Sequence, residues 1–453
     1  MENKIKIAFV SLGCDKNLMD SEIMLGLINE QGYTITPLEE EAEIIIVNSC
    51  GFKMDANEEG IENILRVADY KNTGKCKGLI LAGCMAQRYR EEIFASLPEV
   101  DGIVGTGDFE GIVNVIKKIL DGEKQVKLIT DNNKKLNESN SLKRVVTTTG
   151  GFAYLKIAEG CDKRCTYCTI PSIRGDFRSR TMESLIEEAK LLAKQDVKEI
   201  ILVAQDSSLY GTDLYNGKKM LPTLLKKLSE IKEIEWIRIL YCYPEHIDQD
   251  LIDEMASNPK VCNYIDMPIQ HADDKILKLM GRRSTREKLE NVIKKLREKM
   301  PDICIRTTFI VGFPNETETE FKNLLDFTKK MKFDRLGVFT YSREEGTPAY
   351  NMDNQVDEDI KIERQQAILE LQKDISSEKC KQFIGKTLKV IVEGKIEDEE
   401  NVYCGRSFRD CYEIDGFVFF NGLENEEILA GDFYNIKITD AYEYDLIGEI
   451  VLN

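Results

Sequence analysis

The sequence predicts an α/β protein in three parts. These are an amino-terminal parallel α/β sheet, a central partial, TIM-like (β/α)6 barrel and a small carboxyl-terminal antiparallel β-barrel. Three observations predict them. Strand-like apolar segments alternate with helical patterns as far as about residue 130, and the alternation resumes at Phe152. From Lys379 onward, short alternating strands separated by Gly, Asp and Asn replace it. The predicted boundaries are 1–130, a linker at 131–149, 150–378 and 379–453.

The composition bounds the class of protein. With 453 residues, of which 42% are hydrophobic, the chain is long enough for two or three domains. No apolar run approaches the ~18 residues of a membrane span, and the first residues lack a signal-peptide pattern. Thirteen cysteines fit a reducing compartment with metal chemistry better than a disulfide framework. We therefore expect a cytoplasmic protein without a membrane partner.

The net charge of −18 limits the classes of binding partner that the protein can have. Broad nucleic-acid affinity depends on Lys and Arg that neutralise phosphates, so this charge argues against it. It is compatible with a basic protein partner. From the charge alone, plain solubility is the favoured explanation.

Four strands are expected in the first part, each followed by a helix: 5–10, 43–48, 78–82 and 102–104. Cys14, Cys50 and Cys84 each fall just past one of the first three strands. Ligands bind at that edge of a parallel sheet, so the three thiolates should converge there. The favoured interpretation is that these three cysteines form a cluster site, in addition to the one described below. The alternative is that these cysteines are ordinary buried packing residues.

The linker 131–149 is polar and unpatterned. Beyond it a helix is expected at 182–195, with Leu185, Ala189 and Leu192 on one face. Six strands are expected in the central part: 152–158, 198–204, 235–241, 263–268, 303–311 and 333–341. Barrel enzymes keep their chemistry on the loops after the strands. The loop after the first strand holds the cysteine segment described next. The loops after the other five strands start at Gln205-Asp206, Tyr243-Pro244, Gln270-His271, Gly312-Phe313 and Tyr341-Ser342.

The most informative segment is Cys161-Asp162-Lys163-Arg164-Cys165-Thr166-Tyr167-Cys168. Its three cysteines supply three ligands from one loop. A structural zinc site normally takes four protein ligands, and neither histidine lies nearby in the sequence. A 4Fe-4S cube held by three thiolates keeps one iron free for a substrate. The alternatives are a zinc loop or an incidental group of cysteines.

This C-x3-C-x2-C spacing, with an aromatic residue before the last cysteine, resembles the radical S-adenosylmethionine (SAM) family. The resemblance implies that the free iron binds SAM, and that reduction cleaves SAM to methionine and a 5′-deoxyadenosyl radical. Tyr167 would then contact the adenine, Gly312 would allow close approach of the cofactor, and Gln205 would line the same site. His271 has either a hydrogen-bonding role at the pocket edge or a structural one. Arg174, Arg178 and Arg180 could pair with carboxylates or form a solvated basic loop.

The third part should contain strands at 386–393, 402–404, 411–414, 417–420 and 433–441, preceded by a charged helix at 356–378. From Lys379 to Asn453 there are sixteen Asp and Glu against eight Lys and Arg, a net charge of −8. A barrel with this charge should favour a basic surface over phosphate. The remaining cysteines lack motif spacing and are interpreted as packing residues: Cys76, Cys242, Cys262, Cys304, Cys380, Cys404 and Cys411.

Across nearly its whole length the chain resembles the methylthiotransferases, which combine a cluster-binding domain, a radical SAM core and a TRAM barrel. Gly13-Cys14, Asn48-Ser49-Cys50 and Gly83-Cys84 match the first domain, and Leu155 through Gly175 matches the core signature. The MiaB type modifies adenosine in tRNA. The RimO type methylthiolates the β-carbon of an aspartate in small-subunit ribosomal protein twelve.

Several segments resemble the RimO type: Ser11 to Asn17, Ile170 to Arg180, and Phe333 to Phe339 with Tyr341 to Thr347. Asp15 departs from the proline that is common there. The resemblance implies a transferase with two 4Fe-4S clusters, on Cys14, Cys50 and Cys84 and on Cys161, Cys165 and Cys168, and two SAM per product. No catalytic residue is assigned apart from the clusters, and the sulfur and electron donors are not identified. tRNA is not the expected partner. A MiaB-type tRNA enzyme and a non-catalytic Fe–S sensor or binding protein remain the alternatives.

Overall fold

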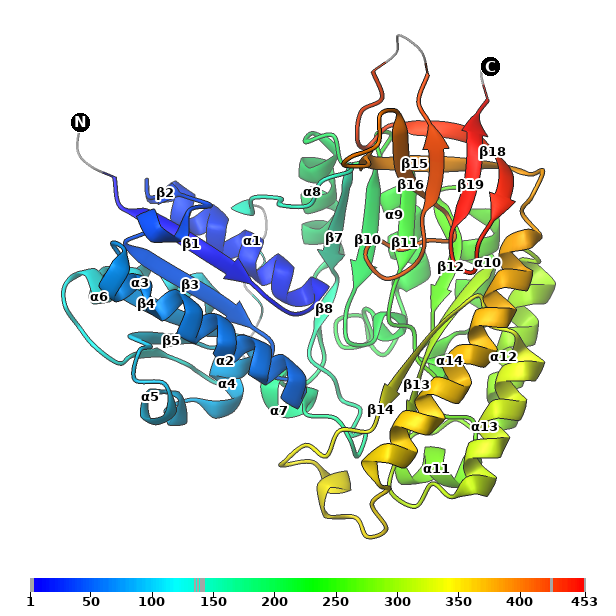
Figure 1. Ribbon diagram of the computed structural model, residues 1–453, viewed down its shortest axis with the longest axis horizontal. Coiled ribbons are helices and arrows are strands. Elements are labelled where there is room, and N and C mark those ends of the chain that lie inside the picture. The colour runs from blue at the N-terminus through cyan, green and yellow to red at the C-terminus, as the bar shows by residue number, and fades with distance from the viewer. Residues whose placement is uncertain (1–3, 134–135, 137, 139–142, 424–426, 452–453) are drawn as a thin grey trace. The chain divides into compact units, whose positions relative to one another are not determined.

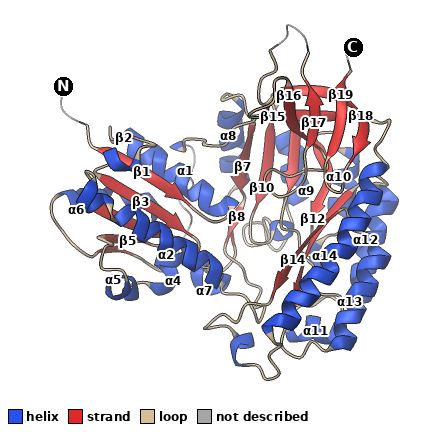
Figure 2. Ribbon diagram, in the orientation of Figure 1, coloured by secondary structure: helices blue, strands red, loops and turns tan. Residues whose placement is uncertain are grey.

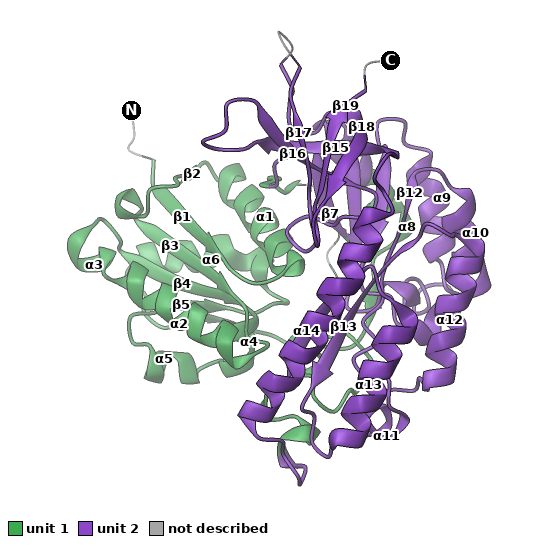
Figure 3. Ribbon diagram, turned by 45° about the vertical axis from the view of Figure 1, so that its right-hand side comes forward, with its two compact units in different colours: residues 1–147, 156–188, 342–350 green, residues 148–155, 189–341, 351–453 purple. Residues whose placement is uncertain are grey.

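A computed structural model of the protein describes residues 4–133, 136, 138, 143–423 and 427–451 (Figure 1). The chain forms two compact units (Figure 3). Unit 1 comprises 1–147, 156–188 and 342–350, and unit 2 comprises 148–155, 189–341 and 351–453. Each unit is built from separate stretches of the chain. The predicted domain boundaries divide the chain into consecutive segments, and they stay a prediction. Among the described residues, no helix is long and apolar enough to cross a membrane.

Unit 1 is built on a six-stranded parallel sheet in the order β2-β1-β3-β4-β5-β6, which confirms the predicted open parallel sheet. Its strands are β1 (Lys6–Ser11), β2 (Thr34–Ile35), β3 (Ile44–Ser49), β4 (Gly78–Gly83), β5 (Gly102–Val104) and β6 (Val126–Leu128). Its helices are α1 (Asp15–Glu30), α2 (Met54–Ala68), α3 (Tyr70–Thr73), α4 (Cys84–Tyr89), α5 (Glu92–Ser96) and α6 (Ile112–Leu120). The edge strands β2 and β6 were not predicted.

The central strand β3 is buried on both faces, as its unbroken run of isoleucine and valine requires. Ile45 and Val47 belong to the core on the α2 side of the sheet. Ile44 and Ile46 belong to the core on the opposite side, with residues of α1 and α6. Helices on both faces bury the sheet and leave the carboxyl ends of its strands for the loops that carry the cysteines.

The second stretch of unit 1, residues 156–188, begins at the last residue of the strand that follows the linker, and the rest of that strand belongs to unit 2. The strand predicted at 152–158 is interrupted: β7 (Phe152–Lys156) ends first, and β8 (Ala158–Glu159) pairs antiparallel with β9 (Arg178–Ser179). The helix α7 (Ile170–Arg174) lies between β8 and β9 in the sequence. Part of the predicted linker, at residues 134–135, 137 and 139–142, lies outside the described residues.

Unit 2 contains a six-stranded sheet in the order β14-β13-β12-β11-β10-β7, and β10 through β14 pair in parallel. Its strands are the red arrows around β10 and β12 in Figure 2. The strands after β7 are β10 (Glu199–Val203), β11 (Trp236–Ile239), β12 (Val261–Asp266), β13 (Cys304–Val311) and β14 (Arg335–Thr340). The helices are α8 (Met182–Ala193), which begins in unit 1, α9 (Leu221–Ser229), α10 (Gln249–Ser257), α11 (Asp274–Leu279), α12 (Arg286–Lys299), α13 (Glu318–Met331) and α14 (Glu358–Lys381). All six predicted strands of the partial barrel are present.

The carboxyl-terminal strands close into the predicted barrel, in the order β15-β16-β17-β19-β18. Its pairs are antiparallel as predicted, except that β17 and β19 are parallel. They are β15 (Thr387–Lys395), β16 (Val402–Ser407), β17 (Val418–Asn421), β18 (Phe433–Ala441) and β19 (Leu446–Ile450). The strand predicted at 411–414 is wrong, because this segment is a turn in which the Cys411 amide donates to the carboxylate of Asp415. The closing strand β19 was missed.

The barrel packs on the amino ends of the sheet strands through buried charged groups. Arg406 of β16 and Arg238 of β11 both bind Glu199 at the start of β10, at 2.7 and 2.8 Å, and none of the three side chains is exposed. Tyr264 of β12 donates to Asp415 at 2.8 Å. The barrel is therefore fixed to the sheet and lies at the end opposite the loops that follow the strands.

Candidate cluster sites

The three amino-terminal cysteines follow adjacent strands of the unit 1 sheet. Cys14 caps α1 after β1, Cys50 follows β3, and Cys84 opens α4 after β4. The ends of these strands are nearly level, because Ser11 pairs with Asn48 and Ser49 pairs with Gly83. The positions agree with the strand-end placement inferred from the sequence.

Close backbone contacts bring the three turns together. A Cβ atom on Gly13 would lie 3.0 Å from the Cβ of Cys50, and one on Gly51 would lie 2.8 Å from the backbone of Cys84. Gly83 has φ +91°, and a side chain there would meet Asn48 and the carbonyl of Ser49. Glycine is thus needed beside these cysteines for the turns to approach one another.

The three thiols differ in exposure. Cys14 is exposed, Cys50 is partly buried and Cys84 is buried. Burial raises the pKa of the Cys84 thiol to about 12, and the nearby Arg174 guanidinium opposes the rise. Burial likewise raises the pKa of Cys50. A metal would have to displace these protons, since the thiolate is the ligand form.

The other three cysteines lie on the loop between β8 and α7. Cys161 and Cys165 are buried and Cys168 is partly buried. The amide of Cys161 donates to the carbonyl of Gly175 at 3.0 Å, and the amide of Cys168 donates to the carbonyl of Cys165 at 3.1 Å. A Cβ on Gly160, which has φ +81°, would lie 2.1 Å from the carbonyl oxygen of Asp176. The β8–β9 pair therefore closes the loop at its base.

Each cysteine set offers three sulfur donors. In the described part of the chain, no group of three or more His, Cys, Asp or Glu side chains is arranged to hold a single metal ion. A single ion needs ligands that converge on one point, whereas a three-thiolate 4Fe-4S site places each thiolate on a different iron. The soft donor set of three sulfurs fits an iron–sulfur cluster. Of the seven other cysteines, all but the partly exposed Cys404 are buried.

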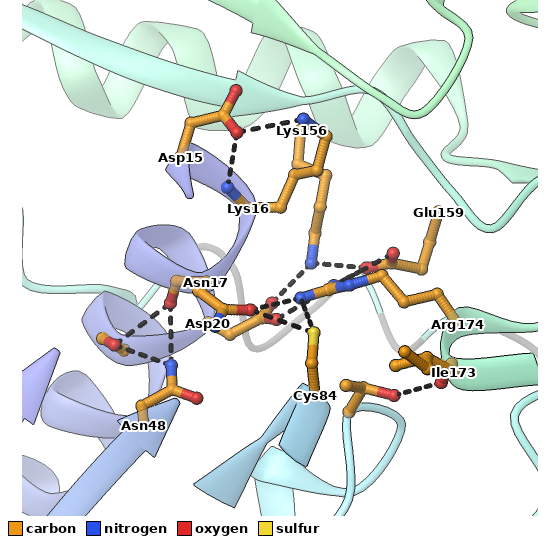
Figure 4. Close-up of polar contacts among 12 residues, drawn as sticks. Asp15, Lys16, Asn17, Asp20, Asn48, Cys84, Lys156, Glu159, Ile173 and Arg174 are labelled. Atoms are coloured by element: carbon orange, nitrogen blue, oxygen red, sulfur yellow. Dashed lines mark hydrogen bonds and ion pairs between the residues drawn. The ribbon is translucent and has the colours of Figure 1, made fainter. Parts of the chain in front are cut away.

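A buried ionic network, which we call the Arg174 network, lies beside Cys84 within unit 1 (Figure 4). It consists of Arg174, Asp20, Glu159 and Lys156. Although burial raises it, Arg174 and Lys156 hold the pKa of Glu159 well below its usual range. The expectation that Arg174 pairs with carboxylates is confirmed, but Asp20 and Lys156 were missed. No local signal marks Asp20, which is 154 positions from Arg174.

A second contact was also missed. Glu344, in the 342–350 stretch of unit 1, accepts from Arg88 at 3.0 Å and from the amide of Met54 at 3.0 Å. The amide of Ala349, in the same stretch, donates to the carbonyl of Thr166 in the cysteine loop at 2.8 Å. One segment therefore contacts both the sheet domain and the cysteine loop.

The remaining predicted residues are distributed between the units. Tyr167 is half-buried in the cysteine loop of unit 1, and Gln205 follows β10 in unit 2. Gly312, after β13, has φ +71°, and a Cβ there would lie 2.2 Å from the Cγ of Lys361. The close approach seen at Gly312 is thus that of a lysine side chain. Contacts of Tyr167, Gln205 and Gly312 with a cofactor remain a prediction.

His271 has a structural place in unit 2. Its ring is fully buried, its Nδ1 accepts from the amide of Asp273 at 3.0 Å, and its Nε2 lies 3.3 Å from Glu316. Glu316 also binds Arg364 at 2.9 Å. The structural alternative for this histidine is the one that these contacts support.

Three family descriptions match parts of the chain: the Radical SAM superfamily at residues 155–328, the Uncharacterized protein family UPF0004 at 6–105 and the TRAM domain at 384–451. Among solved structures, the radical SAM methyltransferase TsrM from Kitasatospora setae matches with a TM-score of 0.57 at 12% identity, covering 76% of this chain and 74% of that one. At that identity the likeness shows the fold alone. Fold and family match together define a radical SAM enzyme.

Curated relatives narrow the class. Ribosomal protein uS12 methylthiotransferase RimO of Lachnoclostridium phytofermentans is 52% identical over 98% of this chain and 99% of its own length. The proteins of the same name from Acetivibrio thermocellus and Clostridioides difficile are 50% and 47% identical, each over 99% of both chains. The chain belongs to the RimO family of methylthiotransferases.

Proposed function

We propose that the protein transfers a methylthio group to the β-carbon of an aspartate in ribosomal protein uS12. The observation that carries the proposal is the identity of about half over 98–99% of the chain to proteins named for this activity. A C–H bond at that carbon has no useful acidity at neutral pH, so a side-chain base could not remove its hydrogen. Radical chemistry avoids this obstacle.

The cofactors are SAM, used twice per product, and two 4Fe-4S clusters. We assign one cluster to Cys161, Cys165 and Cys168 and the other to Cys14, Cys50 and Cys84. When bound, these groups supply an electron for SAM cleavage, a methyl group and a place for the sulfur to be inserted. We further propose that Tyr167, Gln205 and Gly312 contact SAM.

The chain itself orients and protects these groups. Gly160 and the β8–β9 pair hold the cysteine loop in one conformation, and the glycine-lined turns hold the other three cysteines. The burial of Cys84, Cys161 and Cys165 keeps water from these sulfurs. Arg174 and Lys156 neutralise the carboxylates that are buried beside them.

The partner is a basic ribosomal protein, and the acidic carboxyl-terminal part suits it better than tRNA. We place the reaction in the cytoplasm, where the enzyme would have access to a ribosomal protein.

Mass spectrometry after anaerobic turnover tests the proposal. The reconstituted enzyme is supplied with SAM, a reductant and sulfide, and with uS12 and tRNA in the same vessel. We expect a methylthio group on one aspartate of uS12 and none on tRNA adenosine. Modification of tRNA with uS12 untouched would favour the MiaB type, and no SAM cleavage under reduction would favour a non-catalytic Fe–S protein.

A further inference from the structure

We propose that Arg174 is a positioning residue that sets the reduction potential of the cluster on Cys14, Cys50 and Cys84. The inference rests on the proposed function, which places a cluster on these cysteines. It concerns a residue outside both cysteine sets.

Arg174 is the last residue of α7 and is only 2% exposed. Its Nη2 donates to the Sγ of Cys84 at 3.4 Å and to the Oδ1 of Asn17 at 2.5 Å (Figure 4). A cationic donor on a ligand sulfur stabilises the reduced form of a cluster, because the added electron makes the cluster more negative. Arg174 should therefore raise the potential of this cluster.

The same guanidinium is fixed on its other side. Nη1 donates to both oxygens of Glu159 at 3.0 Å and to Asp20 at 3.2 Å. Lys156 binds the same two carboxylates. The two cations are thus balanced by two anions, and the position of Arg174 toward the sulfur is determined by buried partners.

Asn17 extends the arrangement to the other two cysteines. Its side-chain amide donates to the carbonyl of Leu12 at 3.2 Å, just before Gly13-Cys14, and to the carbonyl of Ser49 at 3.0 Å, just before Cys50. Arg174 holds the oxygen of that amide. It therefore contacts one predicted ligand directly and supports the turns that carry the other two.

Glu159 lies two residues before Cys161, so the Arg174 network also joins the base of the second cysteine loop to the first cluster site. The potential of the first cluster helps to decide whether electrons supplied to the enzyme collect there or remain available for SAM. Setting that potential is a role that a purely structural ion pair would not have.

The test is a redox titration followed by electron paramagnetic resonance. The full-length chain carries Cys161→Ala, Cys165→Ala and Cys168→Ala, so that only the first cluster remains. Arg174→Lys keeps the positive charge but removes the paired N–H donors. At a fixed potential it should lower the ratio of reduced to oxidised cluster by up to about tenfold. For a one-electron couple this is a downward shift of the midpoint potential by about 59 mV. Asp20→Asn removes an opposing negative charge and should shift the midpoint upward.

Arg144→Lys is the matched control, because Arg144 is also a buried arginine of unit 1 but pairs with Glu22 and Glu188. It should leave the midpoint unchanged. Equal midpoints for the Arg174→Lys, Asp20→Asn and unchanged chains, shifts of both in one direction, or a background chain without iron would each overturn the inference.

The outcome is separable from that of the proposed function. Methylthiolation of uS12 is assayed separately, in the chain that keeps all six cysteines. Unchanged midpoints, with uS12 modified in that assay, reject the role of Arg174 alone. Opposite shifts of the midpoint, with uS12 unmodified in that assay, support the role of Arg174 and reject the substrate.

Discussion

At the residue scale, the proposed chemistry depends on six sulfur atoms in two different surroundings. Cys161 and Cys165 are buried in a short loop, whereas Cys14, Cys50 and Cys84 are brought together from three strand ends. Both sets contain three cysteines, so a cubane held by either set would keep one iron without a protein ligand. The two sets should therefore be separable by mutation.

Replacing Cys161, Cys165 and Cys168 together by Ala should abolish reductive cleavage of SAM. Iron after reconstitution should fall by about half, because one of two equal cubanes is lost. Chromatography of 5′-deoxyadenosine and an iron assay measure the two effects. Unchanged 5′-deoxyadenosine formation would contradict the assignment.

Replacing Cys14, Cys50 and Cys84 by Ala should leave SAM cleavage in place but stop methylthio transfer. The reason is that the loop with Cys161, Cys165 and Cys168 remains intact, while the site proposed for the inserted sulfur is lost. Mass spectrometry of uS12, with 5′-deoxyadenosine measured in the same sample, checks both parts. Full methylthiolation by this variant would show that the first domain is only structural.

At the scale of elements, the cysteine loop depends on the turn that follows β8. Gly160 combines a positive φ with a carbonyl oxygen where a side chain would stand. An alanine there has to strain the backbone and displace Asp176. Since Cys161 is the next residue, this displacement should reach the cluster site.

We expect Gly160→Ala to lose about half of the reconstituted iron, since only one of two cubanes depends on this loop. Gly122→Ala is the matched control, because Gly122 has φ +93° but no atom within 4 Å of the added Cβ. The control should cost about 1–2 kcal/mol of unfolding free energy from the backbone alone and keep its iron. Equal iron in the two variants would show that the turn does not hold the loop.

At the scale of the whole molecule, the chain has a net charge of −18 and carries its acidic barrel at the amino ends of the unit 2 sheet. Loops after strands lie at the opposite end of that sheet. Acidic groups on the barrel would therefore act on a basic substrate mainly by long-range attraction, which salt screens.

Glu397, Glu399 and Glu400 are exposed in the loop between β15 and β16. Changing all three to Gln should raise KM for uS12 several-fold at low salt, because an exposed charge contributes up to about 1 kcal/mol. The difference should shrink as salt rises. The matched control changes exposed Glu58, Glu59 and Glu62 of α2 to Gln. If the control raises KM equally, total charge rather than the barrel attracts the substrate.

The sequence by itself determined the features that depend on neighbouring residues. Regular β/α alternation placed Cys14, Cys50 and Cys84 after strands, and the cysteine loop was recognisable from spacing alone. The short strands β2 and β6 and the closing strand β19 depended on pairing partners that local propensity does not encode. The turn at 411–414 was missed although the bond from the Cys411 amide to Asp415 is local. Tertiary structure alone decided the long-range polar contacts. Arg88 meets Glu344 across 256 positions, and Arg174 meets Cys84 across 90. A buried charge needs a partner, but only the folded chain determines which one lies within reach.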